Sequence, residues 1–203
     1  MAKKLTTKEK IKLAAKEIFI QKGFAGARME DISKASGINK ALLHYHFTSK
    51  ENLFEQIFDE AFFEIMPRLH AVLLTEGEVM DKIDAFVDEY IATIRQNPHI
   101  PLFVIHELSQ APDRFLQKIK SHPGLPNVAS LIMEVMTAME EGKIRSYPPL
   151  HLVMNVLSMC VFPFVARPII RTVMQVDDHN WDAIIDDRAA MIKQFIRTAL
   201  KPD

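Results

Sequence analysis

Residues 28–50 read RMEDISKASGINKALLHYHFTSK and decide how the N-terminal part of the chain is organised. Met29–Ser36 and Lys40–Phe47 are each expected to form a short amphipathic helix. Gly37 lies between them and supplies the positive φ that a tight turn needs and that a side chain would resist. The pattern predicts a helix-turn-helix, a motif that places its second helix in the major groove of DNA.

Apolar residues at helical spacing are expected to form a small core around this motif. Thr6 and Glu9 have the spacing of a capping box, so a first helix is expected to begin at Thr6 and to end at Gly23. The lysines of this helix, Lys12 among them, are expected to lie largely off its apolar face. Six apolar residues of the motif are expected to point into this core: Met29, Ile32, Ala35, Ile38, Leu43 and Phe47.

The rest of the chain is also expected to be helical, because it has few glycines and few alternating apolar runs. Thr48 and Glu51 repeat the capping-box spacing and predict a long apolar helix that ends at Pro67. Pro163 and Pro168 are expected to bend a further apolar segment. The later helices are expected at residues 80–94, 102–108, 112–120, 128–139, 150–176 and 181–200.

These patterns predict an all-α fold in two parts. Residues 1–50 are expected to form the helix-turn-helix domain and residues 51–203 a second helical domain, with a helix at about 48–66 as the connector. Residues 1–50 hold 11 Lys and Arg against 4 Asp and Glu, a net charge of +7, and the remainder carries −8. A basic first quarter on an acidic remainder indicates a polyanionic partner for the first part only.

The single cysteine, Cys160, excludes an intrachain disulfide and fits a reducing compartment. No apolar segment follows the charged first residues, so no signal peptide is expected. The most apolar stretch, residues 152–166, is shorter than the roughly 20 residues that span a bilayer, which favours a core or interface helix. We therefore expect a cytoplasmic protein.

Five short motifs lie in one consistent spacing: Gly23-Phe24, Asp31-Ile32, Ala35-Ser36-Gly37-Ile38, Leu43 through Phe47, and Ser49 through Leu53. In these motifs the chain resembles the TetR family of bacterial repressors. The specific motif covers about residues 11–54, and the divergent helical remainder fits the family over the whole length. The chain departs from the family pattern at Arg28, at Ala41-Leu42 and at His44, where Thr or Ser, Gly-Thr and Tyr are common. These changes concern base preference more than the fold.

The residues expected to contact DNA are Arg28, Asn39, Lys40, Leu42, His44, Tyr45, His46 and Lys50. Lys40 favours guanine acceptors and Asn39 can pair with adenine, although Asn39 is equally expected to act only as a helix cap. Leu42 is expected either to touch a thymine methyl group or to be a half-buried spacer. Arg28 and Lys50 begin helices, where phosphates bind favourably. Diffuse attraction is expected from Lys3, Lys4 and Lys8.

One such helix buries little DNA surface, so specific binding to a palindromic double-stranded operator is expected to need a homodimer. The strongly apolar segment 150–176 and the last helix are the candidate dimer surface, and a wholly intramolecular core is the alternative. The resemblance also implies a small-molecule inducer in the second domain. Clustered methionines favour an apolar or amphipathic one, although methionines are more often ordinary core. The expected pocket residues are Tyr90, Phe103, His106, Glu107, Met133, Met136, Met159 and Phe162.

The leading hypothesis is a non-enzymatic, DNA-binding transcription repressor that a small ligand releases from its operator. The alternative is a non-catalytic helical ligand-binding or protein-interaction module with nonspecific DNA affinity. The sequence holds no nucleophile motif, no phosphate-cradling glycine loop and no metal-ligand spacing. No catalytic residue, metal site or cofactor is therefore expected.

Overall fold

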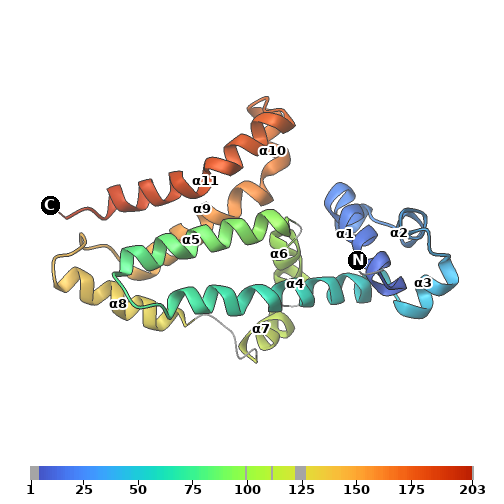
Figure 1. The fold of residues 1–203 in the computed structure, drawn as a ribbon, viewed down its shortest axis with the longest axis horizontal. Coiled ribbons are helices and arrows are strands. Elements are labelled where there is room, and N and C mark those ends of the chain that lie inside the picture. The colour runs from blue at the N-terminus through green and yellow to red at the C-terminus, as the bar shows by residue number, and fades with distance from the viewer. Residues whose placement is uncertain (1–4, 99, 111, 122–126, 203) are drawn as a thin grey trace.

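The computed structural model describes residues 5–98, 100–110, 112–121 and 127–202, and within them the chain forms eleven helices and no strand (Figure 1). The predicted all-α fold is confirmed. The helices α1, α2 and α3 form an N-terminal head at one end of α4, and the other helices surround the far part of α4. The bounds are α1 (Thr7–Gly26), α2 (Met29–Ser36), α3 (Lys40–His46), α4 (Lys50–Leu73), α5 (Val79–Gln96), α6 (Ile100–Gln110), α7 (Pro112–Lys120), α8 (Val128–Glu140), α9 (Pro149–Val165), α10 (Arg167–Val173) and α11 (Asp178–Ala199).

The turn between α2 and α3 has the predicted helix-turn-helix geometry. Gly37 adopts φ 68° and ψ 15°, the left-handed conformation that ends α2. The Ser33 hydroxyl donates a 2.6 Å hydrogen bond to the carbonyl oxygen of Ile38, which holds the two sides of the turn together. Leu43 and Phe47 are fully buried beneath it, as predicted. The second helix is thereby fixed on the first by its inner face, which leaves its outer face free.

The helix predicted to end at Gly23 is interrupted there, since Gly23 has φ 67° and ψ 172°, and a short further turn brings α1 to Gly26. Two other local predictions were wrong. Lys12 does not lie off the apolar face: it is buried and forms an ion pair with Glu60 of α4. Ala35 is exposed and does not belong to the core.

The long helix α4 begins and ends away from its predicted bounds. Its N-cap is Ser49 and not Thr48, since the Ser49 hydroxyl accepts the N–H of Asn52 at 3.1 Å. The helix also continues through Pro67 to Leu73. Leu69 and Leu73 are buried beyond the proline. Their burial offsets the roughly 3 kcal/mol that a proline in a helix interior costs.

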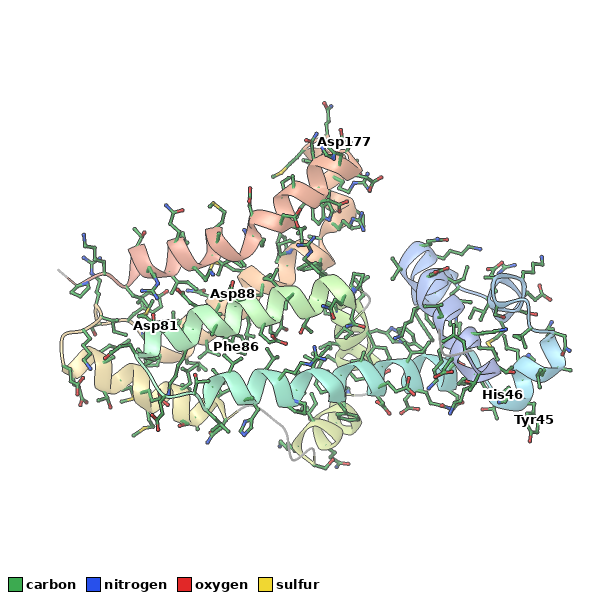
Figure 2. All side chains as sticks on the ribbon, viewed as in Figure 1. Tyr45, His46, Asp81, Phe86, Asp88 and Asp177 are labelled. Atoms are coloured by element: carbon green, nitrogen blue, oxygen red, sulfur yellow. The ribbon has the colours of Figure 1, made fainter. Side chains whose placement is uncertain are left out.

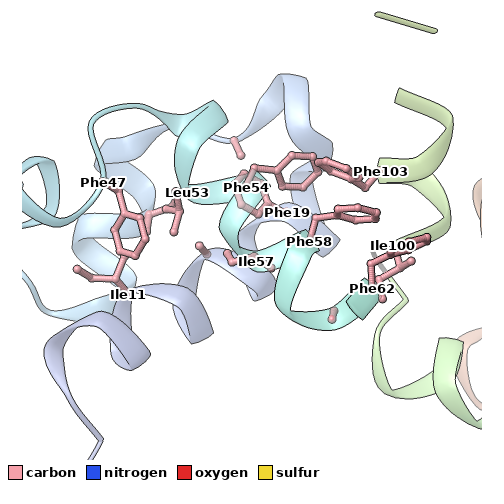
Figure 3. Close-up of a cluster of buried hydrophobic side chains, with 14 of the residues drawn as sticks. Ile11, Phe19, Phe47, Leu53, Phe54, Ile57, Phe58, Phe62, Ile100 and Phe103 are labelled. Carbon is pink, nitrogen blue, oxygen red and sulfur yellow. The ribbon is translucent and has the colours of Figure 1, made fainter. Parts of the chain in front are cut away.

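Two hydrophobic cores fill the molecule. The first joins the N-terminal head to α4, α6 and α7, and phenylalanine rings dominate it (Figure 3). The second lies among α5, α8, α9 and α11. Phe86 and Tyr90 of α5 pack against both cores, so α5 forms the seam between them.

The apolar segment that follows α8 is divided into two helices. Pro163 lies inside α9, and the chain turns by 69° at Ala166 before α10 begins. The predicted bend is therefore confirmed. Among the described residues no single helix has both the length and the apolarity to cross a membrane, and only the bent pair of α9 and α10 meets that test of length and composition when taken together.

A row of ion pairs ties α11 to α5. Lys193 binds Asp88 at 2.7 and 2.8 Å, and Arg197 binds Asp84 and Asp81 at 2.7 Å each. Figure 2 shows Asp81 and Asp88 on the part of α5 near α11, whereas Phe86 lies toward α4. The hydrogen bonds that Arg197 donates to Asp84 and Asp81 raise the pKa of its guanidinium further above its usual value. Such exposed pairs contribute little free energy each, but together they set the register of the two helices.

We predict that Gly37→Ala destabilises the protein by about 1 kcal/mol and Gly37→Val by more, because both residues disfavour the left-handed conformation. A Cβ at this position meets no atom within 4 Å, so the backbone conformation alone causes the loss. Gly37→Asn is the matched control and should cost less, since asparagine tolerates this conformation. Urea denaturation measures the three values. Equal losses for Asn and Val would contradict a conformational origin.

Candidate functional site

The outer face of α3 is strongly exposed. Tyr45 has 82% of its surface accessible, and Leu42 has 37%. His44 is also exposed, and the half-buried ring of His46 lies 5.3 Å from the Tyr45 ring (Figure 2). A tyrosine this exposed contributes almost nothing to the core, so its side chain is free to contact a partner.

The first turn of α3 is already engaged within the head. The Asn39 side-chain oxygen accepts the N–H of Leu42 at 2.8 Å and caps the helix. Lys40 donates a 2.9 Å hydrogen bond to Glu30 of α2, and this bond holds the pKa of Glu30 below its usual value. Both members of that pair are more than half exposed, so water weakens it and Lys40 can exchange Glu30 for a phosphate or a base.

The two cations expected at helix starts have different surroundings. Arg28 is exposed at the N-cap of α2 and its side chain makes no capping hydrogen bond. Lys50 is half-buried: its ammonium donates to the carbonyl oxygen of Phe24 at 2.8 Å and lies 4.3 Å from the centre of the Phe24 ring. Arg28 is thus available to an anion, while Lys50 joins α4 to the end of α1. Lys3 and Lys4 lie outside the described residues.

A cavity of about 400 Å³ lies at the seam between the two cores. Its volume is within the range of small-molecule sites, and its walls are almost entirely hydrocarbon. It is lined by Met66, Leu69 and Leu73 of α4, Ile83, Phe86 and Tyr90 of α5, Val128, Leu131 and Val135 of α8, and Leu152, Val153, Val156 and Leu157 of α9. We call this space the main cavity.

Tyr90 supplies the polar group of the main cavity. Burial raises the pKa of Tyr90 to about 12, with a smaller contribution from Cys160, so the phenol stays protonated. No residue that the structure describes makes a hydrogen bond to its hydroxyl. The hydroxyl is therefore an unused donor and acceptor beside a hydrocarbon space.

Of the eight residues expected to line a pocket, Tyr90 alone lines the main cavity. Phe103 instead stacks on Phe58 of α4, with 3.9 Å between the ring centres, and the His106 ring lies 4.9 Å from the ring of Phe24 in the head. Met133, Met136 and Phe162 are exposed, Met159 packs on the second core, and Glu107 lies on α6 outside the cavity wall. The helix α8 is apolar on most of its surface, so periodicity alone did not reveal that the Val128–Leu131–Val135 face points inward.

Exposed apolar side chains form a stripe on α9 and another on α11. The α9 stripe consists of Leu150, Met154 and Phe162, and the α11 stripe consists of Ile184, Met191 and Phe195. Each stripe follows helical spacing, and the opposite faces of both helices are buried in the second core. Apolar stripes of this extent indicate an interaction surface.

Comparison with known proteins agrees with the geometry of the head. Residues 11–57 match the family model described as bacterial regulatory proteins, tetR family. The chain is 31% identical over 141 residues to the biofilm operon icaADBC negative transcriptional regulator IcaR of Staphylococcus aureus, and the match covers 68% of this chain and 72% of IcaR. The Staphylococcus epidermidis IcaR is 28% identical over 151 residues, 73% of each chain.

Solved structures with a similar fold cover almost the whole chain. The TetR family transcriptional regulator PfmR of Thermus thermophilus has a TM-score of 0.69 at 17% identity over 98% of each chain. HlyIIR, a hemolysin II transcriptional regulator, has a TM-score of 0.62 at 22% identity, and the match covers 97% of this chain and 98% of HlyIIR. At this identity the likeness concerns the fold.

We predict that Cys160 is inert toward thiol reagents in the folded protein. Burial raises its pKa to about 12, so at pH 8 far less thiolate is present than for a free cysteine, and the sulfur is also inaccessible. Reaction with a chromogenic disulfide at pH 8 should be at least ~100-fold slower in buffer than in denaturant. Cys160→Ser provides the blank. Equal rates in both solvents would contradict a buried thiol.

Proposed function

Because the chain belongs to the TetR family of bacterial regulatory proteins, which are DNA-binding transcriptional regulators, we propose that it is a repressor that binds a palindromic operator as a homodimer. We further propose that a small apolar or amphipathic ligand in the main cavity releases it from DNA. The related IcaR proteins are negative regulators, and their regulatory role supports repression over catalysis. The observation that carries the proposal is the exposed outer face of α3 on a fully buried helix-turn-helix core.

The residues of the head support specific roles on DNA. Lys40, Tyr45 and His44 project from the exposed face of α3 and are proposed to contact base edges or phosphates. Arg28 is proposed to bind a phosphate at the start of α2.

Asn39 acts as the cap of α3 through its side-chain oxygen, which leaves its amide N–H groups for a base. Leu42 is exposed enough to touch a thymine methyl group. His46 and Lys50 are proposed to lie at the DNA backbone, with Lys50 first leaving the carbonyl oxygen of Phe24.

The α9 and α11 stripes support the homodimer. In a two-fold dimer the stripes of one protomer would meet those of the other and form a four-helix interface. Such an interface removes six large apolar side chains of each protomer from water. It would hold two heads at a fixed separation, which the reading of two half-sites requires.

From a random duplex pool the protein should enrich a palindrome, and Tyr45→Ala and Lys40→Ala should each weaken binding to it. Loss of a base contact by Lys40 costs about 1–3 kcal/mol, whereas loss of a phosphate contact lowers the salt dependence by about one counterion. Lys143→Ala is the matched control, because Lys143 is similarly exposed but follows α8, outside the head. A titration of bound fraction against salt separates the cases, and binding without enrichment would favour the alternative of nonspecific affinity.

Phe195→Arg should convert the protein to a monomer in sedimentation equilibrium and abolish operator binding, because it places a charge in an apolar interface. Met133→Arg is the matched control, since Met133 has the same 63% exposed fraction as Phe195 but lies on α8 outside the stripes. A dimer that survives Phe195→Arg, or one that Met133→Arg dissociates equally well, would place the interface elsewhere.

A further inference from the structure

A second, smaller cavity of about 90 Å³ adjoins the main cavity. Met66 and Tyr90 line both spaces and form the wall between them. Methionine is unbranched and flexible, so its side chain can move aside at little cost. When Met66 moves, the two cavities become one elongated space. We call the smaller one the second cavity.

The second cavity lies beneath α6. Ile100, Pro101, Val104 and Ile105 of α6 line it, together with Val161 of α9. The adjacent face of α6 contacts both α4 and the head, since the Phe103 ring lies 4.5 Å from the Phe54 ring of α4 and the His106 ring lies 4.9 Å from the Phe24 ring of α1. One helix therefore separates the second cavity from the core of the head. A molecule that enters this cavity presses on the helix to which the head is attached.

The walls of both cavities limit the chemistry of an occupant. No charged side chain lines either space among the described residues. An ionised group taken into such surroundings without a partner loses several kcal/mol of hydration. The unpartnered Tyr90 hydroxyl offers one hydrogen bond, at the wall between the two spaces. The Thr93 hydroxyl of the second cavity lies 3.5 Å from Glu89, at the limit of a hydrogen bond.

We propose that the effector is a neutral, elongated aliphatic molecule with one hydrogen-bonding group, and that its length decides whether it releases DNA. A short molecule fills the main cavity only. A longer one displaces Met66, enters the second cavity and moves α6. This inference rests on the proposed ligand-controlled repressor and adds to it the class of ligand and the part of the cavity that transmits the signal.

The volumes give the expected dependence on chain length. At about 30 Å³ for each water-sized group, the main cavity holds about a dozen groups and the second about three. Each buried methylene contributes about 0.8 kcal/mol, so affinity should rise about fourfold per carbon until the space is full. Removal of one net hydrogen bond corresponds to about a fivefold loss of affinity.

The experiment uses the whole 203-residue chain and straight-chain primary alcohols of about 8 to 16 carbons, a range that brackets the capacity of the two spaces, delivered from cyclodextrin. Binding is measured by calorimetry, and release is measured on the palindrome selected above. Affinity should rise to a maximum length, and release should occur only for the longest alcohols that bind. The carboxylates and trimethylammonium ions of equal length should bind at least ~100-fold more weakly. Tyr90→Phe should weaken the alcohols about fivefold.

Val161→Phe tests the second cavity by filling it from α9. It should shorten the optimal alcohol by about three carbons and abolish release, while the shorter alcohols bind unchanged. Val161→Ala enlarges the same space and should move the optimum in the opposite direction. Thermal unfolding and DNA binding without alcohol establish that both variants fold.

The outcomes separate this inference from the proposed function. If Val161→Phe leaves the dependence of affinity on alcohol length unchanged, the inference is overturned. Equal affinity for the charged homologues also overturns it. Release of DNA by those charged homologues would still support a ligand-controlled repressor. Length-dependent binding of alcohols without release supports the ligand class and overturns the proposed control of DNA binding. Absence of binding by every alcohol overturns the ligand class itself.

Discussion

The phenylalanine rings that α4 shares with α6 hold the N-terminal head to the rest of the molecule. Phe58 lies between Phe62 of its own helix and Phe103 of α6, at centre distances of 4.9 and 3.9 Å. Phe54 continues the stack toward α1, where it lies 4.6 Å from both Phe19 and Phe24. Because buried rings pack at the density of a crystal, the head cannot turn on α4 without opening this core. The head and α6 are therefore expected to move together.

The region around α5 has a different arrangement, because the two separately packed cores meet along this helix. The side of α5 toward α11 is fixed by the ion pairs of Asp81, Asp84 and Asp88. The other side carries Phe86 and Tyr90, which touch both cores without filling the space between them. A void lined by hydrocarbon forfeits the dispersion contacts that its wall atoms would otherwise make. The seam is consequently the place where an added apolar molecule gains the most and where its binding can shift one core against the other.

The features that were predictable from sequence depend on residues close together in the chain. The turn at Gly37 and the inward Leu43 and Phe47 follow from local spacing, and the family motifs add little to that geometry. The bounds of α4 were missed because they depend on tertiary burial, as Leu69 and Leu73 show beyond Pro67. Most of the residues that line the main cavity could not be predicted for the same reason. His106 has a side chain that suits ligand binding, yet its ring packs on Phe24. Met133 and Met136 lie on the outer side of α8, and because that helix is apolar on most faces, periodicity did not separate its outer residues from its inner ones.

The helix α9 connects the features on which the proposed control depends. Leu152, Val153, Val156 and Leu157 line the main cavity, Val161 lines the second cavity, and the α9 stripe faces outward. In a dimer the α9 stripe would pack against the partner, so a bound ligand could displace α9 only slightly. The helices α4 and α6 carry neither stripe, and they contact α1 of the head through Phe54 and His106. An occupant would therefore displace the wall that carries the head, and the rigid dimer interface would direct that displacement toward DNA.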